Sequence, residues 1–434
     1  MNTASSTSTG RLPSETDRLA AQLADPEDLR RRHQLPPWWA QSLAAGALGA
    51  ALLHVHRART GRAGWHTAHT WLAFAARRPI DDGPGSHLHY GAPALAYVLH
   101  HAGAEHLDSD RPGRYARALE MLDARTALLT RARVDAAHRR IDRGDTPALA
   151  EFDAIRGLTG LGALWLRRDP SGPQIRAVLE YLVRLTEPLA AHDGRQRPGW
   201  WTHLAPNGRR TPEFPDGHAN NGLSHGIAGP LALLALAARA GHRVPGQDTA
   251  LRRILDWYDT CQHTKTGHVE NEHSAVGRVW WPYWITDPGV GDVGTSPGRP
   301  SWCYGTPGVA RAQHLAGLAL DDRHRVHAAE SALLAAVSDP HLARRLDNPG
   351  LCHGLAGALV ITRRAAADST SRRLNDHAAD LHRLAADLAT ERAADLGTTA
   401  VEPGLFDGAA GVALALDDAA TPNGQEWDAC LLTS

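Results

Sequence analysis

Seven copies of a short glycine turn divide the chain into units. Each copy reads Gly-x-x-Gly and runs into a stretch rich in Ala and Leu, except that the second copy has Ala at its fourth position. The first glycines of successive turns lie between 45 and 79 residues apart, which leaves room for two helices in each unit. This spacing predicts a repeat architecture built from seven helical hairpins. The seven turns are Gly46–Gly49, Gly91–Ala94, Gly157–Gly160, Gly226–Gly229, Gly305–Gly308, Gly354–Gly357 and Gly408–Gly411.

The stretch that follows each turn is predicted to be helical. Leu231–Ala238, for example, is apolar without the alternation of a strand, and Ala and Leu are among the strongest helix formers. Pro230 and Pro307 fit the first turn of a helix, where the missing N–H of proline costs nothing, with Gly229 and Thr306 as the capping residues. The glycine turns are therefore expected at helix N-termini.

Two layers of helices follow from the distribution of polar residues. The stretches after the turns are apolar nearly all round, which is typical of an inner layer, whereas Ser371–Leu388 has the amphipathic stripe of an outer layer. Seven inner and seven outer helices indicate an all-α fold, an α/α toroid, formed by residues 36–434. An open solenoid is the alternative, because the sequence does not show closure. Residues 1–35 are polar and are expected to form a tail or short helices.

Composition limits the classes of function. With 434 residues, 43% of them hydrophobic, and a net charge of −1, the chain has ample material for a core but no electrostatic case for binding nucleic acid. No apolar run reaches the roughly 18 residues of a transmembrane helix, and the first ten residues lack the features of a signal peptide. We therefore expect a cytoplasmic protein, in which the four cysteines remain free thiols.

Equivalent positions of a repeat lie at the same end of the assembly, so the residues just before the first glycines should form a ring. The position one residue earlier in two neighbouring repeats holds Cys303 and Cys352. Together with His353 they form a Cys2His set that favours zinc and leaves a fourth position open, whereas buried, unreactive cysteines are the alternative. Cys261 and Cys430 are expected to be inert. The ring is predicted to contain Ala45, Tyr90, Arg156, His225, Tyr304, His353 and Asp407.

The charge of such a site favours one kind of chemistry. Zinc with two thiolates and a neutral imidazole has no net charge, so an incoming thiol is deprotonated at the metal and remains nucleophilic. Zinc hydrolases more often use His and carboxylate ligands. Alcohol dehydrogenases share Cys2His ligands but need a dinucleotide domain, and the Gly289–Gly294 motif, between Pro288 and Pro297, is predicted to be a loop. Thiol alkylation is therefore favoured.

Three motifs resemble those of the lanthionine synthetase C (LanC) family of lanthipeptide cyclases: Ser301–Gly308, Cys352–Gly357 and Ser224–Gly229. The similarity extends over all seven repeats, from about residue 38 to 416. The cysteine motifs are highly specific to that family, whereas the glycine turns alone would fit other α/α toroids. The resemblance implies a catalytic toroid with zinc held by Cys303, Cys352 and His353. It also implies that a cysteine thiol of a dehydrated precursor peptide adds to dehydroalanine or dehydrobutyrine and forms a thioether ring.

The resemblance assigns three further residues. The histidine, aspartate and arginine of the family match His225, Asp153 and Arg299. The addition leaves an enolate that must be protonated, and we assign this role to His225, because histidine titrates near neutrality. The alternative is that His225 is a buried histidine with a purely structural hydrogen bond.

Asp153, Arg299 and Tyr304 each have two interpretations. Asp153 either orients a histidine or takes the proton of the thiol, or else it is an exposed helix-capping carboxylate. Arg299 either stabilises the enolate through two N–H groups or forms a structural salt bridge. Tyr304 either hydrogen-bonds the reacting carbonyl or packs beside its glycine turn. The resemblance favours the catalytic role of Asp153.

Two segments outside the motifs carry further expectations. Arg278–Ile285 contains four aromatic residues, Trp280, Trp281, Tyr283 and Trp284. They either wall the site and grip a peptide or form a buried plug that closes the toroid. Some members of the family carry a small additional domain between early repeats. In this chain it would fall within residues 101–150, but the pattern of these residues predicts a charged helix.

The expected partners follow from the resemblance and from the short N-terminal segment, which leaves no room for a dehydratase domain. We expect a stand-alone cyclase that acts on the dehydrated precursor peptide, with a separate dehydratase and an exporter as further partners. One alternative is an enzyme that adds glutathione or another small thiol to dehydrated residues. The other is a zinc-stabilised scaffold without turnover, whose fourth ligand is Cys261 or a further histidine.

Overall fold

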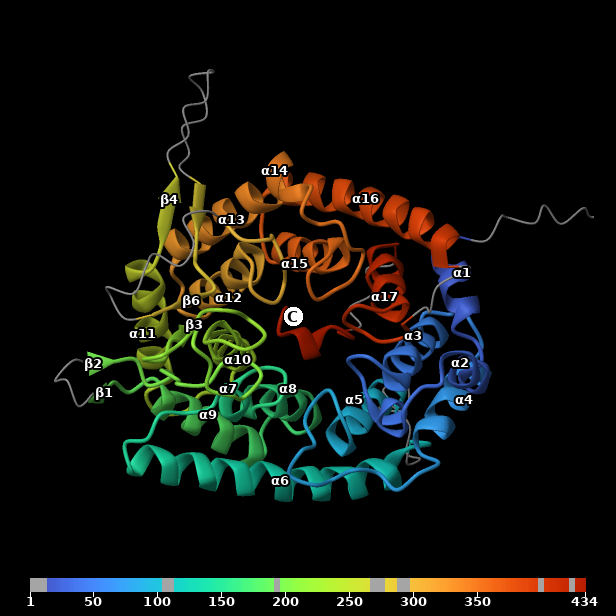
Figure 1. Cartoon of the computed structure of the whole chain (residues 1–434), viewed down its shortest axis with the longest axis horizontal. Coiled ribbons are helices and arrows are strands. Elements are labelled where there is room, and N and C mark those ends of the chain that lie inside the picture. Colours follow the sequence, from blue (N-terminus) through green and yellow to red (C-terminus); the bar gives the residue numbers. More distant parts are fainter. Residues whose placement is uncertain are drawn as a thin grey trace, which may run out of the picture.

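The computed structural model describes residues 14–103, 113–190, 196–265, 278–286, 297–396, 402–420 and 426–434. Its helices form two concentric rings (Figure 1). Every inner helix begins at one of the seven glycine turns, so the predicted α/α toroid is confirmed. The inner helices are α3 (Ala47–Arg59), α5 (Ala92–Gly103), α8 (Leu158–Arg168), α10 (Ala228–Arg239), α12 (Thr306–Ala319), α15 (Leu355–Ala367) and α17 (Ala409–Ala420). The long outer helices are α4 (Trp65–Ala75), α6 (Ala116–Asp142), α9 (Pro173–Leu185), α11 (Gln247–Thr260), α13 (Arg323–Val337) and α16 (Arg372–Leu396).

The distribution of burial follows the two kinds of helix that the sequence predicts. In α10 every residue from Ala228 to Ala238 is buried, because this helix packs against protein on all sides. The outer helix α9 buries only one face, which includes Ile175, Val178 and Leu182. An apolar surface on all sides therefore places a helix in the inner ring, and an amphipathic one places it outside.

The ring is closed by the N-terminal part of the described chain. The last inner helix, α17, contacts the first, α3, and the short helix α1 (Glu15–Gln22) packs on the outside of α17. A second short helix, α2 (Pro26–His33), packs on α4. Leu19 and Leu23 are buried, and Arg57 of α3 pairs with both Asp17 and Asp417. The seventh outer position is thus occupied by a helix from the opposite end of the sequence, and an open solenoid is excluded.

Backbone hydrogen bonds join the seven turns into a belt at one end of the toroid. An N–H group near one turn donates to a carbonyl oxygen near the next, and the last turn bonds to the first. Between the second and third turns, the side chain of His89 makes the link through Nδ1 and the carbonyl oxygen of Ile155. The predicted ring of residues therefore exists. The backbone bonds, between 2.8 and 3.2 Å, run from Leu43 N to His89 O, Ala154 N to Ser224 O, Leu223 N to Cys303 O, Cys303 N to Cys352 O, Cys352 N to Phe406 O, and Phe406 N to Ala44 O.

The remaining elements are short and lie in the connections. The antiparallel pair of β3 and β6 matters for the site, because it aligns Asn220 with Trp284 and so brings the aromatic segment beside the fourth turn. The strands are β1 (Leu189–Ala190) with β2 (Gln196–Arg197), β3 (Ala219–Asn220) with β6 (Trp284–Ile285), and β4 (His263–Lys265) with β5 (Arg278–Trp280). The short helices are η1 (Pro37–Gln41), α7 (Leu149–Phe152), α14 (Pro340–Ala343) and η3 (Ala429–Leu431).

Residues 426–434 occupy the centre of the inner ring, where Figure 1 marks the end of the chain. The indole of Trp302 donates to the Leu431 carbonyl oxygen at 2.9 Å, and the Arg311 guanidinium donates to the carbonyl oxygen of Thr433 at 2.7 and 3.0 Å. Asp428, which is fully buried, pairs with Arg364. The middle of the toroid is therefore filled with protein.

Several expectations are corrected or limited by the structure. The two prolines do lie in the first turns of α10 and α12, but Thr306 is the first residue of its helix and Gly229 the second of its own, so neither is the cap. Within residues 101–150, the described part contains the single outer helix α6 and no inserted domain. Gly289–Gly294 lies outside the described residues. No helix in the described part of the chain is long and apolar enough to span a membrane.

Candidate metal centre and catalytic site

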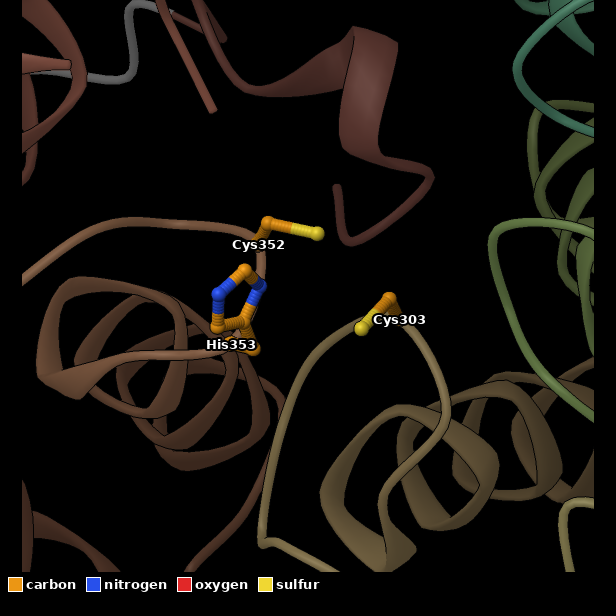
Figure 2. Close-up of side chains that lie close together, drawn as sticks. All are labelled: Cys303, Cys352 and His353. Atoms are coloured by element: carbon orange, nitrogen blue, oxygen red, sulfur yellow. The ribbon is translucent and has the colours of Figure 1, made fainter. Parts of the chain in front are cut away.

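Two neighbouring turns bring the cysteines and the histidine together. Cys303 precedes α12, Cys352 and His353 precede α15, and the N–H of Cys303 donates to the Cys352 carbonyl oxygen at 3.2 Å. The two sulfur atoms and one imidazole nitrogen lie within 4.8 Å of one another. Figure 2 shows the three side chains converging from the two loops. The predicted ligand set is therefore assembled in space.

The loops need glycine because the backbone folds back on itself. A Cβ atom at Gly305 would lie 2.1 Å from the nitrogen of Ser301, and one at Gly354 would lie 2.0 Å from the carbonyl oxygen of Asn348. The Ser301 hydroxyl accepts the N–H of Gly305 at 3.0 Å and lies 3.6 Å from the sulfur of Cys303. The turn motif thus fixes the direction in which each ligand leaves the backbone.

The electrostatics of the three side chains favour a thiolate. A hydrogen bond from Cys352, together with one from His353, holds the pKa of Cys303 well below its usual range, although burial opposes this. The same bond between the sulfur atoms raises the pKa of Cys352, as burial also does. Hydrogen bonding to Cys303 raises the pKa of His353. One sulfur is therefore already poised to carry negative charge, as a metal ligand must.

The donor set fits zinc with an open position. Two sulfur atoms and an imidazole match the softness of zinc, and all three residues remain partly exposed. Among the described residues, the cluster contains these three donors and no fourth. Cys261 lies elsewhere, hydrogen-bonded to Asn221, and burial raises its pKa to about 12. Burial also raises the pKa of Cys430 to about 12.

His225 and Asp153 form a hydrogen-bonded pair beside the metal set. The Nδ1 atom of His225 lies 2.6 Å from Oδ2 of Asp153, which is 1% exposed, whereas the His225 side chain is 25% exposed. The other oxygen of Asp153 accepts the backbone N–H groups of residues 155, 156 and 157 at 3.1, 2.6 and 2.8 Å. One oxygen thus holds the loop before α8, and the other holds His225. The alternative of an exposed helix-capping carboxylate is wrong, because Asp153 is buried and the N-cap of α8 is Gly157, which has no side-chain cap.

Tyr304 is next to both the metal set and this pair. It follows Cys303 directly, and its ring centroid lies 6.3 Å from that of His225. Its hydroxyl oxygen accepts a hydrogen bond from Nδ2 of Asn220 at 3.2 Å. Burial raises the pKa of Tyr304 well above its usual value, so the phenol keeps its proton at neutral pH. The residue is therefore available as a hydrogen-bond donor.

Arg299 is near the metal set, and among the described residues its ion pair is a long one. Its guanidinium lies 4.0 Å from the Asp347 carboxylate, which is largely exposed, and its backbone N–H donates to the Tyr283 hydroxyl at 3.0 Å. The positive charge acts to lower the pKa of both Cys352 and His353. Arg299 therefore contributes positive potential at the site. Its ion pair with Asp347 is long and exposed, and such a pair adds little to stability.

The aromatic segment has a buried half and a partly exposed half. Trp280 and Trp281 are each 4% exposed, and Trp281 packs on Tyr258 of the outer helix α11, so they do not form a plug that closes the toroid. Tyr283 and Trp284 are partly exposed, and their ring centroids lie 5.3 and 6.2 Å from that of Tyr304. The second half of the segment therefore forms an aromatic wall beside Tyr304.

Two residues near the site have roles that the sequence analysis missed. Asn220 contacts Tyr304 as described, and Asp407, predicted only as a ring position, has a carboxylate oxygen 3.5 Å from Nδ1 of His353. A signal for Asn220 was present in the repeat: it lies six residues before Gly226, as Asn348 lies six before Gly354. Both amide oxygens accept a backbone N–H two residues on, at 3.0 and 2.6 Å.

Comparison with known proteins agrees with the fold. A solved structure, described as "Nisin cyclase", superposes with a TM-score of 0.71 over 96% of both chains, at 20% sequence identity. The "Nisin biosynthesis protein NisC" of Lactococcus lactis subsp. lactis is 27% identical over 49% of this chain, and the match spans 48% of that protein. The chain thus matches about half of the length of this curated relative. The sequence profile described as "Lanthionine synthetase C-like protein" matches residues 37–432, so the chain belongs to the lanthionine synthetase C-like family.

Proposed function

We propose that this protein is a zinc-dependent lanthipeptide cyclase. Its substrate is a dehydrated precursor peptide, whose cysteine thiols add to dehydroalanine or dehydrobutyrine and form lanthionine or methyllanthionine rings. The observation that carries the proposal is the placement of Cys303, Cys352 and His353 within 4.8 Å of one another, beside the His225–Asp153 pair. Family membership supports the same activity.

Cys303, Cys352 and His353 are the residues that would hold zinc. Bound there, zinc supplies a positive charge that lowers the pKa of a peptide thiol without removing its nucleophilicity. The partial exposure of these three side chains supports access for a peptide. It argues against a closed structural site, since the described residues offer no fourth donor in the cluster.

The remaining chemistry falls to side chains of the protein. The sulfur forms a bond to the β-carbon, the C=C bond becomes a single bond, and negative charge moves to the carbonyl oxygen of the dehydrated residue. We assign the stabilisation of this charge to Tyr304 and Arg299; the ring contact of Tyr304 with His225 and the Coulombic effect of Arg299 on Cys352 support this assignment. His225, held by Asp153, delivers a proton to the α-carbon. One proton leaves the thiol sulfur for the solvent, and one is added at the α-carbon by His225, which the solvent protonates again. The peptide's mass is therefore unchanged.

The chemistry of the substrate implies partners. A dehydratase must first convert serine or threonine of the peptide to the dehydrated residues, and we propose that this is a separate protein. We also propose an exporter for the cyclised peptide and a cytoplasmic site of action. The aromatic wall of Tyr283 and Trp284 would contact residues next to the reacting pair.

The experiment measures free thiols in a dehydrated, cysteine-containing peptide encoded near the gene. After incubation with the protein, alkylation and mass spectrometry should show loss of alkylatable thiol without change of mass. Chelation of zinc or Cys303→Ala should abolish this loss, whereas Cys261→Ala, remote from the cluster, should keep both zinc and activity. Thiols that stay alkylatable with zinc-loaded protein would contradict the proposal, and glutathione addition would then show as a mass increase of the peptide.

A further inference from the structure

Tyr304 is held by the loop that also carries His225. The loop runs from Asn220 to His225, and the amide side chain of Asn220 donates to the hydroxyl oxygen of Tyr304 at 3.2 Å. The backbone of Gly222 lies against the ring, since a Cβ atom there would be 2.7 Å from Cδ1 and 2.9 Å from Cε1 of Tyr304. One loop thus fixes the ring and the hydroxyl, and presents His225 as well.

The orientation of the Asn220 amide is determined by its two partners. Its oxygen accepts the N–H of Gly222 at 3.0 Å, which leaves the NH2 group facing the phenol. Asn220 is completely buried, so no solvent competes for these contacts. The amide is therefore a fixed donor toward Tyr304, and it does not accept the phenol proton.

This contact determines where the phenol proton points. A phenol O–H lies near the plane of its ring and has two opposite orientations, one of which would meet the Asn220 amide protons. Because Asn220 already donates to that side of the oxygen, the O–H of Tyr304 must turn to the other side. Among the described residues, the structure shows no acceptor for this O–H. A substrate carbonyl oxygen is the partner that the arrangement leaves open.

We propose that Asn220 is a positioning residue that acts through Tyr304. It directs the Tyr304 O–H at the carbonyl oxygen on which negative charge develops when the thiol adds to the dehydrated residue. This inference rests on the proposed cyclase activity and adds to it a residue that does not itself touch the substrate. It also makes the loop from Asn220 to His225 the common support of the proton donor and the charge-stabilising group.

The sharpest perturbation is Asn220→Asp. The carboxylate keeps an acceptor for the N–H of Gly222, so the loop retains its internal hydrogen bond. It cannot donate to Tyr304, however, and accepts the phenol proton instead, which turns the O–H away from the substrate. We expect kcat to fall about 10²-fold, as after loss of one oxyanion donor, with KM little changed. Asn220→Ala should cost less, about tenfold or below, because the O–H then samples both orientations.

A double-mutant cycle with Tyr304→Phe distinguishes positioning from a structural role. Without the hydroxyl there is nothing to direct, so adding Asn220→Asp to Tyr304→Phe should change kcat by no more than about twofold. Asn348→Asp is the matched control: it has the equivalent loop position and hydrogen bond, and no contact with Tyr304 is found in the described structure. Its effect should be the same in both backgrounds. Zinc content and the urea midpoint verify that each variant is folded.

Each result bears on the proposal. Equal losses from Asn220→Asp with and without the Tyr304 hydroxyl would overturn the positioning role while leaving the cyclase activity intact. If burial of the carboxylate prevents folding, the cycle with Asn220→Ala makes the same distinction. Absence of ring formation by the wild-type protein would overturn the proposed function and this inference together.

Discussion

The two oxygens of Asp153 lead to a prediction that separates stability from rate. Asp153→Ala removes the acceptor of three backbone N–H groups in a partly buried loop, as well as the partner of His225. An unsatisfied buried N–H costs about 1–3 kcal/mol, so the loss in unfolding free energy should reach roughly 3 kcal/mol or more. Asp153→Asn keeps one oxygen for the loop and should lose about 1–2 kcal/mol, most of it from the charged bond to His225.

The effect on rate should be large for both variants. With Asn, an NH2 group faces Nδ1 of His225, which must then be the unprotonated nitrogen, and the negative charge that supports a protonated imidazole is gone. A positioned acid contributes about 10²–10⁴-fold, so Asp153→Asn should lose at least about 10²-fold in the single-turnover rate of ring formation. The double variant with His225→Ala should be no slower than His225→Ala alone.

Thiol alkylation with mass spectrometry measures the rate, and urea unfolding measures stability. Ser42→Ala is the control: Ser42 precedes its glycine by four residues, as Asp153 does, and its hydroxyl accepts the N–H of Ala45 at 3.1 Å. It should cost about 1 kcal/mol in stability and less than twofold in rate. An Asp153→Asn protein that forms rings within twofold of the wild-type rate would refute the assigned role of the pair.

Three further predictions use other parts of the structure. In zinc-stripped protein, Cys303 should react with iodoacetamide at a pH below the usual thiol range, because its lowered pKa keeps the thiolate as pH falls. Cys261 and Cys430, whose pKa burial raises to about 12, are the internal controls. Equal labelling of all four cysteines would contradict this prediction. Asp428→Ala removes the fully buried carboxylate that pairs with Arg364, whose side chain is 20% exposed, and should lower the free energy of unfolding by about 3 kcal/mol, so an unchanged urea midpoint would show that the central segment does not stabilise the ring. Trp284→Ala should raise KM for the peptide several-fold with kcat little changed, and a change confined to kcat would place the residue in the chemistry instead.

The turns and inner helices could be predicted because the repeat uses glycine for a physical reason at the same place each time. A side chain at Gly305 or Gly354 would collide with the backbone of its own loop, so glycine recurs at these positions and the pattern can be recognised in the sequence. The same periodicity predicts that Cys303 lies beside Cys352, because both cysteines hold the same position in neighbouring repeats. Contacts within one repeat unit, or between equivalent positions, are therefore readable from the sequence.

Contacts between non-equivalent positions could not be predicted in this way. The pairing of Arg57 with Asp17 and Asp417 joins α3 to segments at both ends of the sequence, and no local pattern indicates it. The contact between Asn220 and Tyr304 crosses from one repeat to the next and depends on the close approach of Gly222 to the ring. The role of Asp153 stays open in the sequence because the choice between its interpretations needs the position of each oxygen.

The way the ring closes has a consequence for synthesis on the ribosome. Helix α1, made among the first of the described residues, has its packing partner in α17, and the inner helices surround residues 426–434, which are made after all of them. The turns that carry Cys303, Cys352 and His353 belong to a belt whose final bonds join Phe406 to Ala44. A nascent chain therefore exposes apolar inner helices until residues 402–434 have emerged, and newly made protein should depend on chaperones until the ring has closed.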